Sequence, residues 1–228
     1  MSEIWHGLIK ALELIVTLDP EVMEIAGRSL AISVTATLLA SVICLPLGSL
    51  IHFNRFIGKR ALINLIQTFY SIPTVVVGLF VFLLLSRAGP LGGLNLLFTP
   101  TVMIIGQMIL ITPVLLGLTI SAFSGVDKAI PDTARSLGAS DFQTVVLVLK
   151  EARFAVMAAI LLAFGRAISE VGLALMVGGN IRGFTRVFTT AISLETSKGD
   201  IELAIALGII LILIALIINI VLNRLQQR

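Results

Sequence analysis

The sequence has very little of the residue types that build metal sites and disulfide frameworks. It contains one cysteine and two histidines among 228 residues, and only 13% of its residues are charged. A single cysteine, Cys44, cannot form a disulfide within the chain. His6 and His52 are far apart in sequence, so they and Cys44 give no metal-ligand spacing. We therefore predict neither a disulfide-stapled fold nor a metal site.

Because charged residues are scarce, the sequence contains long uncharged runs. Hydrophobic residues make up 57% of the chain, against roughly 45 to 50% in soluble domains. Four uncharged runs, and a fifth stretch that carries two charges, are long enough for the roughly 20 residues that cross a bilayer, and the turn sequence AGPLGG at 88–93 separates the second from the third. The expected spans lie between Arg28 and His52, between Arg60 and Arg87, at about 101–122, at about 154–177, and after Glu202. The predicted fold class is an all-α membrane protein with about five transmembrane helices.

The predicted domain organisation is simple. Residues 1–27 carry apolar side chains at helical spacing, which predicts an amphipathic helix at the membrane interface or one that packs on neighbouring spans. Residues 28–223 form one transmembrane domain, which contains a polar segment at 123–154, and residues 224–228 form a cytoplasmic tail. Pro46, Pro73 and Pro113 lie inside expected spans, where we expect kinks.

The basic residues indicate the orientation. With the amino terminus outside, the inner segments hold Arg55, Lys59, Arg60, Lys128, Arg135, Lys150, Arg153, Arg224 and Arg228, and the outer segments hold Lys10, Arg28, Arg87, Arg182, Arg186 and Lys198. Nine basic residues inside against six outside favour this orientation, with the carboxyl terminus in the cytoplasm. Because these residues are scattered over short loops, we expect membrane lipid, and no nucleic acid, as a partner.

The polar segment at 123–154 carries a motif. In DTARSLGASDFQTVVLVLKEAR, Asp132 can stabilise the first turn of a short helix, Gly138 can end it, and Asp141 can cap a second helix. The stretch resembles the cytoplasmic loop of ABC importer permeases, whose pattern is Glu-Ala-Ala, three variable residues and Gly. Asp132, Thr133 and Ala134 stand at the first three positions and Gly138 at the glycine, whereas Lys150-Glu151 replace the later Leu-Pro.

Two further stretches extend the resemblance over the chain from about residue 27. SIPTVVVGLFVFLLL and FGRAISEVGLALMVGGNIRGFTRVFTTAISLETSKGD are similar to the molybdate, tungstate and sulfate branch of these permeases, and EVGLALMVGGNI looks most like the tungstate members. The resemblance implies a permease subunit in the cytoplasmic membrane that moves tungstate, with molybdate or sulfate as alternatives.

The resemblance also implies the fold and the partners. The fold is that of a type I ABC importer permease, in which two copies of the permease pair. Two ATPase subunits dock on them, and an extracytoplasmic protein delivers the oxyanion. The implied ATPase-coupling residues are Asp132, Thr133, Ala134, Arg135, Gly138 and Ala139.

The sequence predicts that a partner subunit, and not this chain, hydrolyses ATP. No GxxxxGK[ST] loop occurs, so we expect ATP and Mg²⁺ to be bound by the ATPase and no cofactor to be bound here. The spans contain a single acid, Glu170, so we expect no membrane-embedded enzyme. A channel or a structural membrane subunit remains the alternative of a different class.

Arg166 and Glu170 are the charged residues of the expected span at about 154–177. Four positions apart in one helix, they would share a face, as a structural ion pair or as a border of the translocation route. The residues expected at the route or gate are Arg166, Glu170, Gly172, Met176, Gly178, Gly179 and Asn180. Arg182 and Arg186 follow outside, where they could attract an oxyanion, contact the binding protein, or serve only as solvated loop charges.

Overall fold

The computed structural model describes residues 2–226, and these residues form helices and no β-strand. The α-helices are α1 (Ser2–Val16), α2 (Pro20–Phe53), α3 (Lys59–Thr68), α4 (Thr74–Leu85), α5 (Pro100–Ser124), α6 (Ala129–Ser136), α7 (Asp141–Glu151), α8 (Arg153–Ile168), α9 (Phe188–Lys198) and α10 (Ile201–Gln226). Two 3-10 helices, η1 (Phe69–Ser71) and η2 (Gly92–Leu94), and one π-helical turn, η3 (Ala174–Gly178), complete the order. The all-α prediction is confirmed.

Three of these helices, α2, α5 and α10, are long and apolar enough to cross a membrane. A fourth span arises if the bent pair formed by 59–71 and α4 counts as one. The expected span at about 154–177 is not one helix, because α8 has 16 residues and ends at Ile168. Its remaining part forms a break followed by the π-helical turn.

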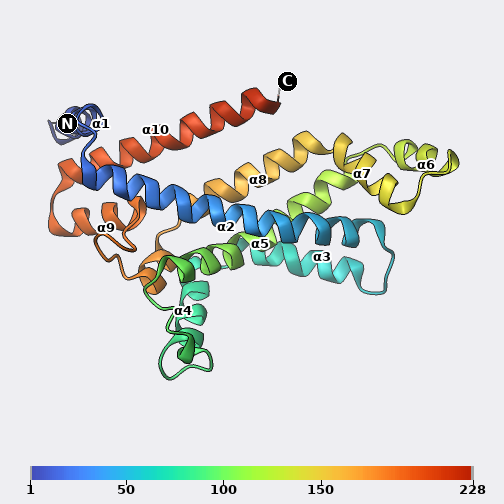
Figure 1. Cartoon of the computed structure of the whole chain (residues 1–228), viewed down its shortest axis with the longest axis horizontal. Helices are drawn as coiled ribbons and strands as arrows, with labels where there is room; N and C mark the ends of the chain where they lie inside the picture. Colours follow the sequence, from blue (N-terminus) through green and yellow to red (C-terminus); the bar gives the residue numbers. More distant parts are fainter. Residues whose placement is uncertain (1, 227–228) are drawn as a thin grey trace.

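The three prolines expected to cause kinks occupy different positions relative to the helices. A bend of 97° lies between 59–71 and α4, where Pro73 immediately precedes the helix. Proline restricts the residue before it to extended backbone, and Ile72 has φ −62° and ψ 130°. Pro46 and Pro113 lie inside α2 and α5, which continue through them. After the bend at Pro73, α4 projects away from the long helices (Figure 1).

Helix α2 begins earlier than the run of uncharged residues suggests. Asp19 precedes it and its side chain accepts a hydrogen bond of 3.0 Å from the backbone N–H of Val22, while Pro20 occupies the first turn. Both residues are favoured at helix starts. The boundary expected after residue 27 therefore lies inside α2.

Helix α1 packs on α10. A Cβ on Gly7 would lie 2.5 Å from Cγ2 of Ile205, and Ala11 is buried. Ile4 and Trp5 on α1 remain exposed. Of the two expected placements of this helix, the structure shows packing on a neighbouring span, with an apolar face left uncovered.

The central core lies between α2 and α5. A Cβ on Gly48 would lie 2.8 Å from Cγ2 of Thr119, and Ala36, Ala40 and Cys44 of α2 are fully buried. Small side chains let two helix backbones approach closely, which is a main source of helix association in a membrane. This helix pair is the frame against which α3 and α8 pack.

The two ends of the long helices differ. In Figure 1, α1 and α9 lie at one end, whereas the connection from α2 to α3 and the α6–α7 hairpin lie at the other. Two of the segments that the charge count places inside, 54–60 and 125–153, thus share one end. The arrangement is consistent with an amino terminus outside and a cytoplasmic hairpin.

Cysteine labelling tests this orientation. In a Cys44→Ser background, Asn54→Cys should be protected from an impermeant thiol reagent added to intact cells, whereas Ser197→Cys should be labelled. Both wild-type side chains are exposed, so exposure alone does not separate them. Labelling at 54 with protection at 197 would reverse the orientation.

Candidate functional site

The α6–α7 hairpin is built around a left-handed glycine. Gly138 has φ +86°, a conformation that favours glycine, and it follows the end of α6. The backbone N–H of Ala139 reaches back to the carbonyl of Ala134 at 3.0 Å, which closes the turn. Gly138 therefore ends α6 as predicted.

The second helix of the hairpin starts one residue earlier than expected. Ser140, not Asp141, is its cap: the hydroxyl of Ser140 accepts from the N–H of Gln143 at 3.3 Å, and the amide oxygen of Gln143 accepts from the N–H of Ser140 at 2.8 Å. This is a capping box, which satisfies two otherwise unpaired donors. Asp141 instead occupies the first turn of α7, and Asp132 occupies that of α6 as predicted.

The hairpin presents an exposed surface. Leu137 is 83% exposed and Phe142 is 76% exposed, on either side of the glycine turn. Beside them lies an open hollow of about 790 Å³. Its lining residues are Ala129, Ile130, Thr133, Ala134, Leu137, Gly138, Ala139, Gln143 and Leu147. Large exposed apolar side chains rimmed by polar residues mark protein contacts.

The sequence-predicted coupling residues gather here. Thr133, Ala134, Gly138 and Ala139 line the hollow. Asp132 and Arg135 are exposed on α6, and Arg135 lies 3.8 Å from Asp141, a distance typical of a weak surface ion pair. The structure therefore brings the predicted residues into one short helix and its turn.

A rigid path leads from the hairpin into the bundle. Thr144 and Val148 of α7 are buried, and Val148 packs with Phe123, Ala152 and Val156. Only Ala152 separates α7 from α8. The hairpin is thus joined to α8 by a single residue and by buried packing, and the 16 residues of α8 extend about 24 Å at roughly 1.5 Å per residue.

Helix α8 ends where the charged residues occur. Arg166 lies in its last turn, where a cation is favoured by the helix dipole, and Glu170 lies beyond its end. The expectation that these two side chains share one helix face is therefore wrong. Among the described side chains, Arg166 forms no ion pair, and its buried Nε has no hydrogen-bond partner.

Glu170 acts as a cap for the segment that follows the break. It is 5% exposed, and its Oε1 accepts a hydrogen bond of 2.8 Å from the N–H of Leu173. The hydroxyl of Thr189, from α9, donates to the carbonyl of Glu170 at 2.7 Å. These bonds satisfy groups that the end of α8 and the start of the next turn leave without helical partners.

Close glycine contacts hold the next segment between two helices. A Cβ on Gly78 of α4 would lie 3.0 Å from Cα of Leu173, and one on Gly106 of α5 would lie 2.7 Å from Cδ2 of Leu173. Leu173 is fully buried as a result. Met176 lies against Gly78, with its sulfur 3.2 Å from that same position. Of the predicted gate residues, Met176 therefore packs on α4.

The remaining predicted gate residues are closely packed or have left-handed backbone. A Cβ on Gly172 would approach Val75 at 2.8 Å, and one on Gly178 would approach the sulfur of Met103 at 2.7 Å. Gly179 has φ +70° and Asn180 has φ +50°. The side-chain nitrogen of Asn180 donates to the carbonyl of Thr190 at 3.2 Å, while its buried Oδ1 has no partner. These residues form a constrained, irregular segment inside the helix bundle.

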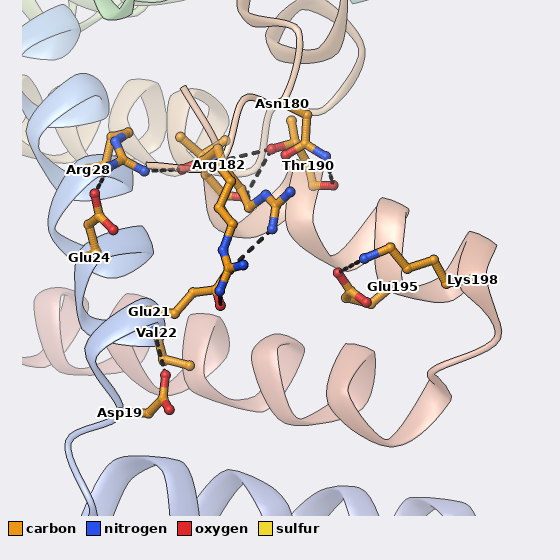
Figure 2. Close-up of polar contacts among 12 residues, drawn as sticks. Asp19, Glu21, Val22, Glu24, Arg28, Asn180, Arg182, Thr190, Glu195 and Lys198 are labelled. Atoms are coloured by element: carbon orange, nitrogen blue, oxygen red, sulfur yellow. Dashed lines mark hydrogen bonds and ion pairs between the residues drawn. The ribbon is translucent and has the colours of Figure 1, made fainter. Parts of the chain in front are cut away.

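Arg182 and Arg186 share one carboxylate at the outer end. Nη2 of Arg182 lies 2.6 Å from Oε2 of Glu21, and Nη1 of Arg186 lies 3.2 Å from Oε1 of the same side chain. Figure 2 shows Glu21 reaching from α2 toward Arg182, with the Glu24–Arg28 and Glu195–Lys198 pairs nearby. The arginines are thus paired rather than merely solvated.

Several of these contacts were absent from the sequence-based prediction. The sequence does not distinguish Leu173 from other apolar residues, because Gly78 and Gly106, which it contacts, lie far away in the sequence. Glu21 was unassigned, although Asp19 and Pro20 just before it carry a helix-start signal that points to a capped first turn. The role of Thr189 depends entirely on the tertiary position of α9.

Residues 27–228 match the family described as "Binding-protein-dependent transport system inner membrane component". The chain belongs to this family. The permease is 42% identical over 206 residues to the tungstate uptake system permease protein TupB of Peptoclostridium acidaminophilum, which covers 90% of each chain. It is 39% identical to TupB of Campylobacter jejuni, with 90% of the permease and 86% of that protein covered.

Solved structures agree on the fold. The permease superposes with a TM-score of 0.76 on a chain of a bacterial ABC transporter involved in the import of alginate. The sequences are 19% identical, and 95% of the permease and 83% of that chain are covered. At this identity the match shows the fold alone, which is that of type I ABC importer permeases.

Proposed function

We propose that this permease carries tungstate across the cytoplasmic membrane as the transmembrane subunit of an ABC importer. The observation that carries the proposal is the similarity to two tungstate uptake permeases over about nine-tenths of the chain. Relatives named for molybdenum and sulfate transport are more distant. Molybdate and sulfate, tetrahedral dianions like tungstate, are therefore the alternative substrates.

The proposal includes three kinds of partner. A second copy of the permease completes the pathway, two ATPase subunits bind ATP and Mg²⁺, and an extracytoplasmic protein delivers the anion. The ATPase contact is assigned to the α6–α7 hairpin because Leu137 and Phe142 are exposed beside an open hollow. An apolar anchor that enters a pocket is the usual centre of a protein interface.

The proposed mechanism follows the rigid path through α7 and α8. Movement of the ATPase displaces the hairpin, and α8 carries that displacement to Arg166 at its far end. Arg166 lies in a largely apolar helix without an acidic partner among the described side chains, so its charge is available to a dianion. A transport site must attract the anion and yet release it, and a single unpaired guanidinium meets both conditions.

Glu170 has a different role in this proposal. Its carboxylate is occupied by the N–H of Leu173, so it borders the route mainly by positioning the turn after α8. Gly172 and Gly178 allow that turn to lie against α4 and α5, and Gly179 allows it to lie against Phe98, where a larger side chain would collide. The segment that contains these residues is the proposed gate.

Tungsten accumulation tests the function. A bacterial host without its own tungstate importer should accumulate tungsten, measured by mass spectrometry, when it expresses the permease with the ATPase and the binding protein. A variant ATPase that binds but does not hydrolyse ATP should abolish the accumulation. Accumulation that persists with that variant would indicate a channel and contradict the proposal.

A further inference from the structure

Glu21, at the outer surface, has no role in the proposed function. It lies in the first turn of α2, and its two carboxylate oxygens bind two different arginines of the loop 179–187. We propose that Glu21, Arg182 and Arg186 form an ion-pair latch that holds this loop, and that a carboxylate of the docking binding protein replaces Glu21 to release it. The exchange of Glu21 for a carboxylate of the binding protein rests on the proposed function.

The latch is the attachment of the loop tip to α2. Arg182 lies at the tip, immediately before Gly183, which has φ +75°, and Arg186 lies nearer the base of the loop. The base of the loop has its own attachments to α2, because Arg28 donates to the carbonyl of Arg186 at 3.0 Å and Ser29 accepts from the N–H of Phe188 at 2.9 Å. The loss of Glu21 would therefore free the tip, while the base stays in place.

The geometry of the latch suits exchange. Each arginine uses one nitrogen and one carboxylate oxygen, whereas the strongest guanidinium–carboxylate pairs are bidentate. The side chain of Arg182 is 73% exposed and that of Glu21 is 39% exposed, so the Arg182 contact is open to solvent and contributes little to stability. A carboxylate on a partner that engages Arg182 through both nitrogens would displace Glu21.

The charge balance favours an acidic partner. Two guanidinium groups share one carboxylate, which leaves the latch with a net positive charge. A cavity of about 410 Å³ adjoins it, and Lys10 and Lys198 are among its lining residues, with four basic side chains against three acidic ones. A protein that presents a carboxylate here gains electrostatic steering, and a lysine would be repelled.

The loop is connected directly to the proposed gate. It begins at Gly179, immediately after the π-helical turn, and the hydroxyl of Thr185 donates to the carbonyl of Gly178 at 2.5 Å. The same hydroxyl accepts from the N–H of Ile181 at 3.0 Å. Release of the tip therefore acts on the last residues of the turn that Glu170 caps at its other end.

A spin label on the loop tests the latch without any partner. Phe184 is exposed at the tip, so the full-length chain in nanodiscs, with Cys44→Ser and Phe184→Cys, accepts a nitroxide label there. Glu21→Gln should raise the mobile fraction of the spectrum. The matched control is Glu13→Gln, which makes the same change in an ion pair with Lys10 that does not touch the loop.

Salt provides a second readout of the same sample. Because exposed ion pairs are screened, the mobile fraction of the parent should rise with NaCl concentration, and that of Glu21→Gln should not. Equal mobility in the parent and in Glu21→Gln, or an equal response to salt, would overturn the latch.

Docking of the binding protein tests the exchange. Glu21→Gln removes the carboxylate that competes with the binding protein for Arg182. The dissociation constant of this variant for the tungstate-loaded binding protein should therefore fall about two- to fivefold, the range expected for an exposed ion pair. Arg182→Gln should weaken it in both backgrounds. Weaker binding by Glu21→Gln would overturn the exchange. A parent that binds no such protein would overturn the proposed function instead, and the spin-label result would still decide the latch.

Discussion

Gly138→Val is expected to reduce association of the ATPase with the permease by about tenfold or more, while the variant chain still inserts in the membrane. Gly138 has φ +86°, and a β-branched side chain in that conformation is strained by of order 1 to 3 kcal/mol. A free-energy loss of about 1.4 kcal/mol corresponds to tenfold in affinity. The measurement is co-purification of the ATPase, followed by titration in detergent.

The matched control for this variant is Gly138→Asn. Asparagine tolerates the left-handed conformation better than other residues with a Cβ, and no atom lies within 4 Å of a Cβ built on Gly138. Gly138→Asn should therefore retain most of the association. If Gly138→Val binds the ATPase as tightly as the parent, the glycine turn is not part of the coupling surface.

Arg166→Met is expected to lower the rate of tungstate uptake at least tenfold in proteoliposomes, with the assembled complex intact. The substitution keeps an unbranched side chain at the end of α8 and removes the charge proposed to attract the dianion. Because Arg166 forms no ion pair among the described side chains, its loss leaves no carboxylate unpaired there. The ATPase and the binding protein should associate normally.

Substitutions of Glu170, alone and with Arg166→Met, distinguish a role of Arg166 in transport from a purely structural one. Glu170→Gln keeps an oxygen that can accept from Leu173, so its uptake should stay near the parent rate, and the double variant with Arg166→Met should behave like Arg166→Met alone. Glu170→Ala leaves a buried N–H unpaired, at a loss of about 1 to 3 kcal/mol of stability. Parent-like uptake by Arg166→Met would show that the arginine is only structural.

Elements that depend on local rules were predictable from the sequence. The long apolar runs predicted α2, α5 and α10, and Gly138 predicted the end of α6, because span length and left-handed turns depend on nearby residues alone. The cap of α7 was assigned to Asp141 instead of Ser140, although Ser140 followed by Gln143 is a local signal of a capping box.

The break after α8 was not predictable in the same way. The stretch 164–180 reads as one apolar helix, and nothing near Ser169 in sequence forces it to end. The helix ends because of contacts with other elements. The hydroxyl of Thr189 in α9 donates to the carbonyl of Glu170, and Leu173 fills the space that Gly78 of α4 and Gly106 of α5 leave. Tertiary contacts here override the helical pattern.

The most direct test of the account is competitive uptake by proteoliposomes that contain the permease, its ATPase and the tungstate-loaded binding protein. ATP should drive tungstate accumulation, and excess unlabelled tungstate should suppress the uptake of labelled tungstate far more than equal molybdate or sulfate. The preference for tungstate is predicted from the relationship to tungstate uptake permeases, and the need for ATP from the proposed ABC importer assembly. Sulfate or molybdate that is carried equally well, or tungstate uptake without ATP, would contradict it.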